Sequence, residues 1–252
     1  EKGEWKLTLP EIPEGYSISI KGSDREAVIG LDGRIYPPLV DAVVNLTFEV
    51  VRLSDNTTAL TDTFEITVPG TEDIDPSANE VPKVIPSLRE WVGRKGSFTM
   101  GHDSKIYVDP NYYDELKDIA EVFAEDMRDI NGYLPEVATS RPDTGDFYLT
   151  LNCSDEGLGE EGYYFDVDDV VTISANTPKG VFYGTRTALQ VLVQDSGKDN
   201  IPKGIARDYP KYKSRGFMLD VGRKYFPMSF LQDCVKLMSW YKMNEFQVHL
   251  ND

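Results

Sequence analysis

The chain has 252 residues, which is more than a typical single domain and predicts two or three. Its 43 acidic and 26 basic side chains give a formal charge of −17, which argues against nucleic acid or an anionic membrane surface as a partner. No apolar run reaches the ~20 residues that a membrane span needs. Two histidines, two cysteines and the lack of a Gly-rich phosphate loop predict no metal and no cofactor.

Residues 1–70 have the pattern of β-strands. The segments WKLTL, YSISI, VVNLTFEVVRL and TFEITV alternate or run β-branched and aromatic, with turn residues between them. This pattern predicts a small β-sandwich with immunoglobulin-like (Ig-like) architecture. The stretch LDGRIYPPLVDAVVNLTFEV also resembles the Ig-like modules of secreted bacterial enzymes. We therefore expect a secreted or cell-surface protein, with an export signal that is not in this sequence.

A linker and an α+β domain are expected next. Residues 71–83 are polar, acidic and bounded by proline, which is typical of a linker. In residues 84–207, Asp109 precedes a proline and opens a periodic apolar segment that Gly132 closes, as N-cap and C-cap of a helix. Two strands follow, DFYLTLNC and GYYFDVDDVVTISA. Thr177 and a proline then open a second helix, VFYGTRTALQVLVQ, which completes a compact α+β domain.

The last segment, residues 208–252, reads as a strand, a helix and a strand. RGFMLDV and NEFQVHL are apolar on both faces and flank the helical MSFLQDCVKLMSWYKM, so a βαβ unit with parallel strands is predicted. Arg215 precedes the first strand, whereas Asp220 and Arg223 follow its apolar core. Charges at strand ends are stable only when they are paired or face a ligand, as they do in the active sites of parallel barrels.

These motifs resemble those of a known family. SRGFMLDVGRKYFP, YKMN and FQVHLND are similar to the opening of the catalytic barrel in family 20 glycoside hydrolases, the β-N-acetylhexosaminidases and lacto-N-biosidases. ANTPKGVFYGTRTALQVL resembles the last helix of the domain that precedes the barrel. The resemblance covers about residues 84–252. The positions that match the family pattern are Arg215, Gly216, Asp220, Arg223, Lys242, Asn244, His249 and Asp252.

The resemblance implies a multidomain chain that ends with the start of a truncated (β/α)₈ TIM barrel. It also implies retaining hydrolysis assisted by the substrate's own 2-acetamido group, one of the exceptions to the two-carboxylate scheme. The catalytic Asp-Glu pair of the family lies on later strands, so we assign no catalytic residue here. The implied partners are a glycan with a terminal N-acetylhexosamine and the remainder of the barrel. A barrel needs roughly 200 residues, so the chain alone is predicted to be inactive.

The resemblance also implies roles for individual residues. Arg215 would bind hydroxyls of the terminal sugar, and the alternative is a structural ion pair with Asp220. Asp252 would shape the floor of the pocket. Asp220 and Arg223 are expected to hold the barrel together within a polar network. His249 would belong to that network or be a hydrogen-bonded interior histidine.

Two other functions fit the sequence. The first is a non-catalytic carbohydrate-binding or adhesion module, in which exposed aromatic side chains stack on sugars. Its candidate aromatics are Trp5, Tyr16, Tyr36 and Trp91. In the second, the α+β domain is a structural brace that packs on the barrel.

Overall fold

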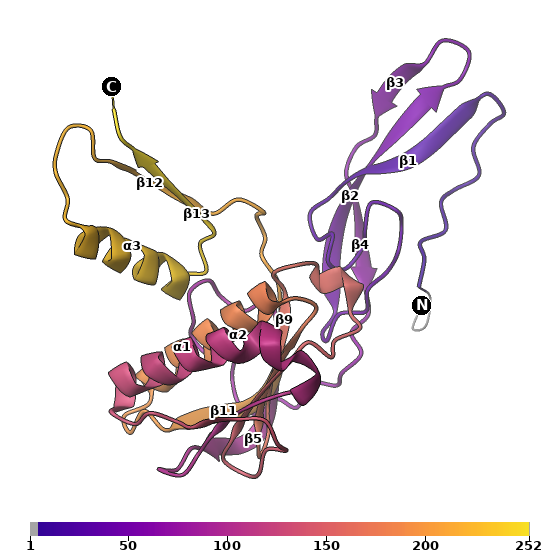
Figure 1. Cartoon of the computed structure of the whole chain (residues 1–252). Helices are drawn as coiled ribbons and strands as arrows, with labels where there is room; N and C mark the ends of the chain where they lie inside the picture. The colour runs from indigo at the N-terminus through magenta and orange to yellow at the C-terminus, as the bar shows by residue number, and fades with distance from the viewer. Residues whose placement is uncertain (1–4, 252) are drawn as a thin grey trace.

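The computed structural model describes residues 5–251. The chain forms an N-terminal antiparallel sheet, a mixed sheet covered by two helices, and a C-terminal strand–helix–strand unit (Figure 1). The first and last parts flank the central one and project from it (Figure 1). None of the helices in residues 5–251 is long and apolar enough to cross a membrane.

The N-terminal sheet is built around one long strand. Strand β2 (Ala42–Arg52) pairs antiparallel with β1 (Tyr16–Ser23) on one side. On its other side it pairs with β3 (Thr57–Leu60) and β4 (Phe64–Val68), one after the other. Alternate residues of β2, from Ala42 to Phe48, are buried, as expected for a sheet with one covered face.

The two facing sheets of a sandwich are not seen in the described part of this segment. Four strands form a single sheet, and WKLTL contributes only an isolated bridge between Lys6 and Arg34. The inner face is covered in another way, because Val28 and Ile29 of a loop and Leu158 and Tyr209 of the next domain share its core. These residues bury the apolar face that a second sheet would otherwise cover.

The central domain has a seven-stranded sheet in the order β5-β11-β9-β10-β8-β6-β7. The pairs along β5-β11-β9-β10 are antiparallel, and the pairs along β10-β8-β6-β7 are parallel. The strands are β5 (Glu90–Thr99), β6 (Ile106–Val108), β7 (Val137–Ala138), β8 (Phe147–Thr150), β9 (Tyr163–Val167), β10 (Val171–Ala175) and β11 (Asn200–Asp208). The segment GYYFDVDDVVTISA, predicted as one strand, is therefore the β9–β10 hairpin.

The two predicted helices are present, and the predicted N-cap Asp109 caps a short 3₁₀ turn before the first of them. Asp109 accepts a hydrogen bond from the Asn111 amide at the start of a 3₁₀ turn, η1 (Pro110–Tyr112), which leads into α1 (Tyr113–Asn131). Gly132 ends α1 with a φ of 82° and donates its N–H to the Arg128 carbonyl. Thr177 caps α2 (Pro178–Gln194). Both helices lie side by side against the sheet (Figure 1).

The C-terminal unit contains β12 (Gly216–Asp220), α3 (Met228–Trp240) and β13 (Glu245–His249). The strands are parallel, as the sequence predicts, with Gly216 opposite Glu245 and Asp220 opposite His249. Both strands therefore begin at one edge of this small sheet, here the amino edge, and finish at the other, the carboxyl edge.

Candidate functional site

The carboxyl edge carries three of the predicted polar residues. Asp220 and His249 are the last residues of their strands, and Arg223 follows in the turn after β12. The Val221 amide donates to the His249 carbonyl at 2.9 Å, and one Asp220 oxygen accepts from the Gly222 amide at 2.9 Å. These bonds fix the start of the turn, while the Asp220 and Arg223 side chains are exposed. Asp252, the fourth expected residue, lies outside the described residues.

Arg215 lies at the opposite, amino edge, immediately before β12. Its Nη2 donates to Glu161 Oε2, its Nε to the Lys242 carbonyl and its Nη1 to the Tyr212 carbonyl, each at 2.7 Å. Its side chain is only 14% exposed. All three guanidinium nitrogens thus have acceptors within the protein, and the sugar-binding role implied for Arg215 has no geometric support.

Arg215 does form a structural ion pair, but its partner is not the predicted Asp220. Arg215 pairs with Glu161 and not with Asp220, because Arg215 and Asp220 stand at opposite ends of β12. Asn244, immediately before β13, completes the contact: its side-chain amide donates to Glu161 Oε1 at 3.0 Å and its side-chain oxygen accepts from the Arg215 amide at 2.9 Å. One carboxylate of the central domain therefore holds the starts of both parallel strands.

Lys242 makes a second connection from the same edge. It lies in the turn between α3 and β13 with a φ of 55°, and its side chain is 7% exposed. Its Nζ donates to the Tyr163 hydroxyl at 2.6 Å and to Asp208 Oδ2 at 3.0 Å. The same hydroxyl donates to Asp208 Oδ2 at 2.6 Å and contacts Thr187 Oγ1 at 2.6 Å. A left-handed backbone is unusual for lysine, and here it directs the ammonium group into the central domain.

Burial, with the neighbouring Asp208 carboxylate, raises the pKa of the Tyr163 hydroxyl well above its ordinary value. The hydroxyl therefore keeps its proton and can donate to Asp208 while it accepts from Lys242. A third link lies beside it: Gln190 Nε2 donates to the Trp240 carbonyl at the end of α3 at 2.7 Å, and to the Ile85 carbonyl at 2.8 Å. The amino edge is thus an anchor to the central domain.

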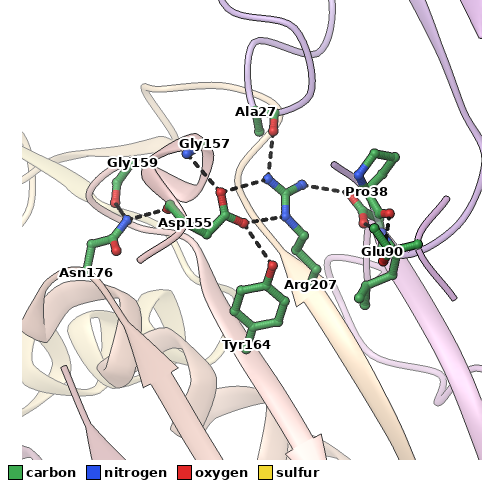
Figure 2. Close-up of polar contacts among 11 residues, drawn as sticks. Ala27, Pro38, Glu90, Asp155, Gly157, Gly159, Tyr164, Asn176 and Arg207 are labelled. Atoms are coloured by element: carbon green, nitrogen blue, oxygen red, sulfur yellow. Dashed lines mark hydrogen bonds and ion pairs between the residues drawn. The ribbon is translucent and has the colours of Figure 1, made fainter. Parts of the chain in front are cut away.

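A further buried cluster joins the central domain to the N-terminal sheet (Figure 2). Arg207 is fully buried in β11 and donates to Glu90 Oε1 at 2.8 Å, to Asp155 Oδ2 at 2.6 Å and to the Ala27 carbonyl at 2.7 Å. Burial lowers the pKa of Arg207, but the bonds and charges of Asp155 and Glu90 outweigh that effect and raise it. Glu90 Oε2 in turn accepts from the Leu39 amide at 2.6 Å, so both modules share one network.

These anchors are the functional residues that the sequence reasoning missed. Lys242 and Asn244 matched the family pattern, but no role was assigned to them, and Glu161, Arg207 and Asp155 were not singled out. A usable signal exists for Arg207 alone, because it directly follows the apolar Ile205 and Ala206, and an arginine buried with them must have a partner. In residues 5–251 no group of three or more His, Cys, Asp or Glu side chains could hold a metal ion.

Two family models assign the central and C-terminal parts to the glycoside hydrolases. The model of glycosyl hydrolase family 20, domain 2, matches residues 81–209, and the model of the family 20 catalytic domain matches residues 212–252. The chain belongs to glycosyl hydrolase family 20.

Similar proteins are known from several bacteria. The chain is 31% identical over 140 residues to a lacto-N-biosidase of Bifidobacterium bifidum, which covers 55% of this chain and 12% of that protein. It is 28% identical over 178 residues to a β-hexosaminidase of Porphyromonas gingivalis, covering 67% of this chain and 22% of that one. The solved N-acetyl-β-hexosaminidase of Streptomyces plicatus matches with a TM-score of 0.62 and 26% identity, over 71% of this chain and 36% of that structure. The chain thus spans between 12% and 36% of the length of these relatives.

Proposed function

We propose that the chain is part of an exo-glycosidase that removes N-acetylhexosamine, or lacto-N-biose, from glycans. Membership of family 20 and the activities in the relatives' names support this proposal. The structural observation that carries it is the parallel β12–α3–β13 unit, whose carboxyl edge presents Asp220, Arg223 and His249. Barrel enzymes place their active sites at this edge of the strands.

In this proposal, residues 212–252 are the first βαβ unit of a (β/α)₈ barrel, and further strands of a longer protein complete it. The exposed apolar side chains of this unit support that reading, because Phe217, Met218 and Met228 are 42%, 59% and 67% exposed and need a cover. The Asp-Glu pair would then lie on those further strands. The substrate's acetamido oxygen would attack the anomeric carbon while an acid protonates the leaving group.

We propose a distribution of roles that differs from the one that the resemblance implied. We assign the binding of sugar hydroxyls to Arg223, because it follows the carboxyl end of β12 and its rigid fork of N–H donors suits neighbouring oxygens. Arg215 instead anchors the barrel to residues 81–209 through Glu161. The brace role of the central domain is supported by the Lys242 and Gln190 contacts to the same edge.

A comparison of two arginine variants tests this assignment. In the longer protein, Arg223→Lys should lower kcat/KM for a chromogenic N-acetylglucosaminide by at least about tenfold. Arg215→Lys should lower the melting temperature and change kcat/KM less. The reverse pattern would return the sugar contact to Arg215.

The 252-residue chain itself should release no chromophore from the same substrate. Measurable hydrolysis by this chain would show that the catalytic pair lies within it, and would contradict the proposed division of the active site.

A second candidate function is carbohydrate binding by the N-terminal module. Trp5 is 65% exposed and Tyr16 42% exposed, as stacking platforms would be. Trp91, in contrast, donates its indole N–H to the Asn79 carbonyl at 3.1 Å and is packed against Gly204. Glycan-array binding that is lost in Trp5→Ala would favour this candidate.

A further inference from the structure

Two buried polar atoms in the described part of the chain have no hydrogen-bond partner. In residues 5–251, Arg89 Nε and Tyr209 Oη are the buried side-chain nitrogen and oxygen atoms without a hydrogen bond. Leaving a buried donor unpaired is costly, and such groups in a native protein call for an explanation, for example a bound ion or ligand. The two residues are neighbours, because the Arg89 guanidinium carbon lies 5.3 Å from the centre of the Tyr209 ring.

Both residues line the same cavity of about 340 Å³. It lies between the central domain, the segment after β11 and the amino edge of the C-terminal unit, to which Arg215 and Lys242 belong. Its volume is within the range of about 300–1,000 Å³ that small-molecule sites occupy. Four tyrosine residues contribute to its wall, namely Tyr163, Tyr183, Tyr209 and Tyr212.

The cavity is locally cationic, although the chain as a whole carries a charge of −17. Its lining includes four cationic residues, Arg89, Lys211, Arg215 and Lys242, and two acidic ones, Glu161 and Asp208. The two carboxylates are already paired, Glu161 with Arg215 and Asp208 with Lys242. Arg89 and Lys211 have no ion pair in the described part of the chain, so an excess of positive charge faces the cavity.

We propose that this cavity binds an acidic sugar, with the sugar carboxylate held by Arg89 and the Tyr209 hydroxyl and the sugar ring lying among the tyrosine side chains. A guanidinium group pairs with carboxylates through parallel N–H donors, and tyrosine offers a flat apolar face together with a polar end. The ligand would supply the acceptor that both buried donors lack.

The protonation of Tyr209 fits this role. Burial, with the nearby Glu90 carboxylate, raises the pKa of Tyr209 to about 12, so the hydroxyl remains a donor at neutral pH. Glu90 is itself engaged by Arg207 and by the Leu39 amide. Because the cavity adjoins the amino edge and not the carboxyl edge, the proposed site is separate from the proposed active site and does not depend on it.

The proposal is tested by titrating the 252-residue chain with glucuronate, glucose and benzoate. Saturation-transfer NMR and calorimetry measure the binding. Glucuronate should bind with a millimolar Kd, and glucose, which lacks the carboxylate, should bind at least about tenfold more weakly. Arg89→Gln should weaken glucuronate binding by about tenfold or more. The matched control is Arg141→Gln, which removes an exposed arginine outside the cavity and should leave the affinity unchanged.

A second variant separates binding from folding. Tyr209→Phe removes a hydroxyl that forms no hydrogen bond within residues 5–251, although Glu90 lies nearby, so it should weaken glucuronate binding while the melting temperature stays within a few degrees of the unmodified chain. Equal affinity for glucose and glucuronate, or full affinity in Arg89→Gln, would overturn the proposal. Binding of benzoate, the third probe, without binding of glucuronate would overturn it as well, because the site would then select an aromatic acid.

Discussion

At the scale of single residues, burial decides what an ion pair contributes. Arg207 approaches Asp155 at 2.6 Å with a side chain that is 0% exposed, and Arg34 approaches Glu156 at 2.5 Å with a side chain that is 55% exposed. The distances are almost equal. Water screens the exposed pair, whereas loss of Arg207 would leave two carboxylates, Glu90 and Asp155, without their cation.

Arg207→Met should therefore lower the free energy of unfolding by about 3–5 kcal/mol. Arg34→Met, the matched control, should lower it far less, because water screens the exposed pair. Urea denaturation followed by circular dichroism measures both values. Losses of equal size would mean that burial does not set the strength of these pairs.

The side chain of Asp109 makes the free energy of unfolding depend on pH. Burial alone would raise its pKa, but hydrogen bonds from Asn111 and Thr150 outweigh burial and lower it. A carboxyl whose pKa is lower in the folded state stabilises the fold above its unfolded pKa of about 3.9, and this contribution disappears as the pH falls through the folded pKa. Asp109→Asn should cost about 1–2 kcal/mol at pH 7.

That cost should shrink as the pH falls below about 4, because the wild-type carboxyl then becomes neutral too. Urea denaturation of both proteins at a series of pH values between 7 and 2 measures the difference. Asp62→Asn, at an exposed position, serves as the control and should run parallel to the wild type. A constant cost for Asp109→Asn at all pH values would contradict the role of its charge.

The sequence located charged residues at the ends of β12 but could not identify their partners. Glu161 precedes Arg215 by 54 positions, and nothing in its local context, GEEGYY, marks it as a buried partner. The edge on which a charge lies can be read from its position before or after the strand. Its contacts depend on how two domains meet, and a local pattern does not contain that information.

At the scale of elements, local signals predicted helices better than strands. The caps at Asp109, Gly132 and Thr177 act within four residues along the chain, so they could be read directly. Strands β5 and β11 were missed because glycine, lysine and proline interrupt their apolar alternation. They pair with each other across about 100 positions, and tertiary pairing overrides weak strand propensity.

The turn between α3 and β13 should control how firmly the C-terminal unit is held. Lys242→Met removes the ammonium group from Asp208 and Tyr163, so amides of residues 228–249 should exchange hydrogen faster, while those of α2 change little. Hydrogen-exchange mass spectrometry resolves the two regions. Lys236→Met, at an exposed position of α3, is the control and should leave exchange unchanged. If the exchange rates of residues 228–249 in Lys242→Met equal those of the unmodified chain, the contacts of Lys242 do not anchor the unit.

At the scale of the whole molecule, the N-terminal sheet and the central domain behave as one body. They share a hydrophobic core that includes Leu158 and Tyr209, and the Arg207 network lies across their boundary (Figure 2). The composition of residues 71–83 predicts a linker, and residues 71–77 are exposed and lie outside helices and strands. The sequence could not reveal the contacts that hold the two modules together beside this connection.

Cutting the connection should therefore not separate the modules. With a protease site inserted in residues 71–77, the two fragments should co-elute from a size-exclusion column after cleavage, because core and network remain. The same cut in an Arg207→Met background should release them. Separate elution of the fragments without that substitution would mean that the modules are joined only by the chain.

The hydrogen bonds and ion pairs from Arg215, Lys242 and Asn244 to Glu161 and Asp208 all lie at the amino edge of the C-terminal unit. In the proposed enzyme, loops at the carboxyl edge can lengthen, shorten or exchange side chains over evolution while the contacts at the amino edge stay constant. A lineage can thereby acquire a new sugar preference without rebuilding its scaffold.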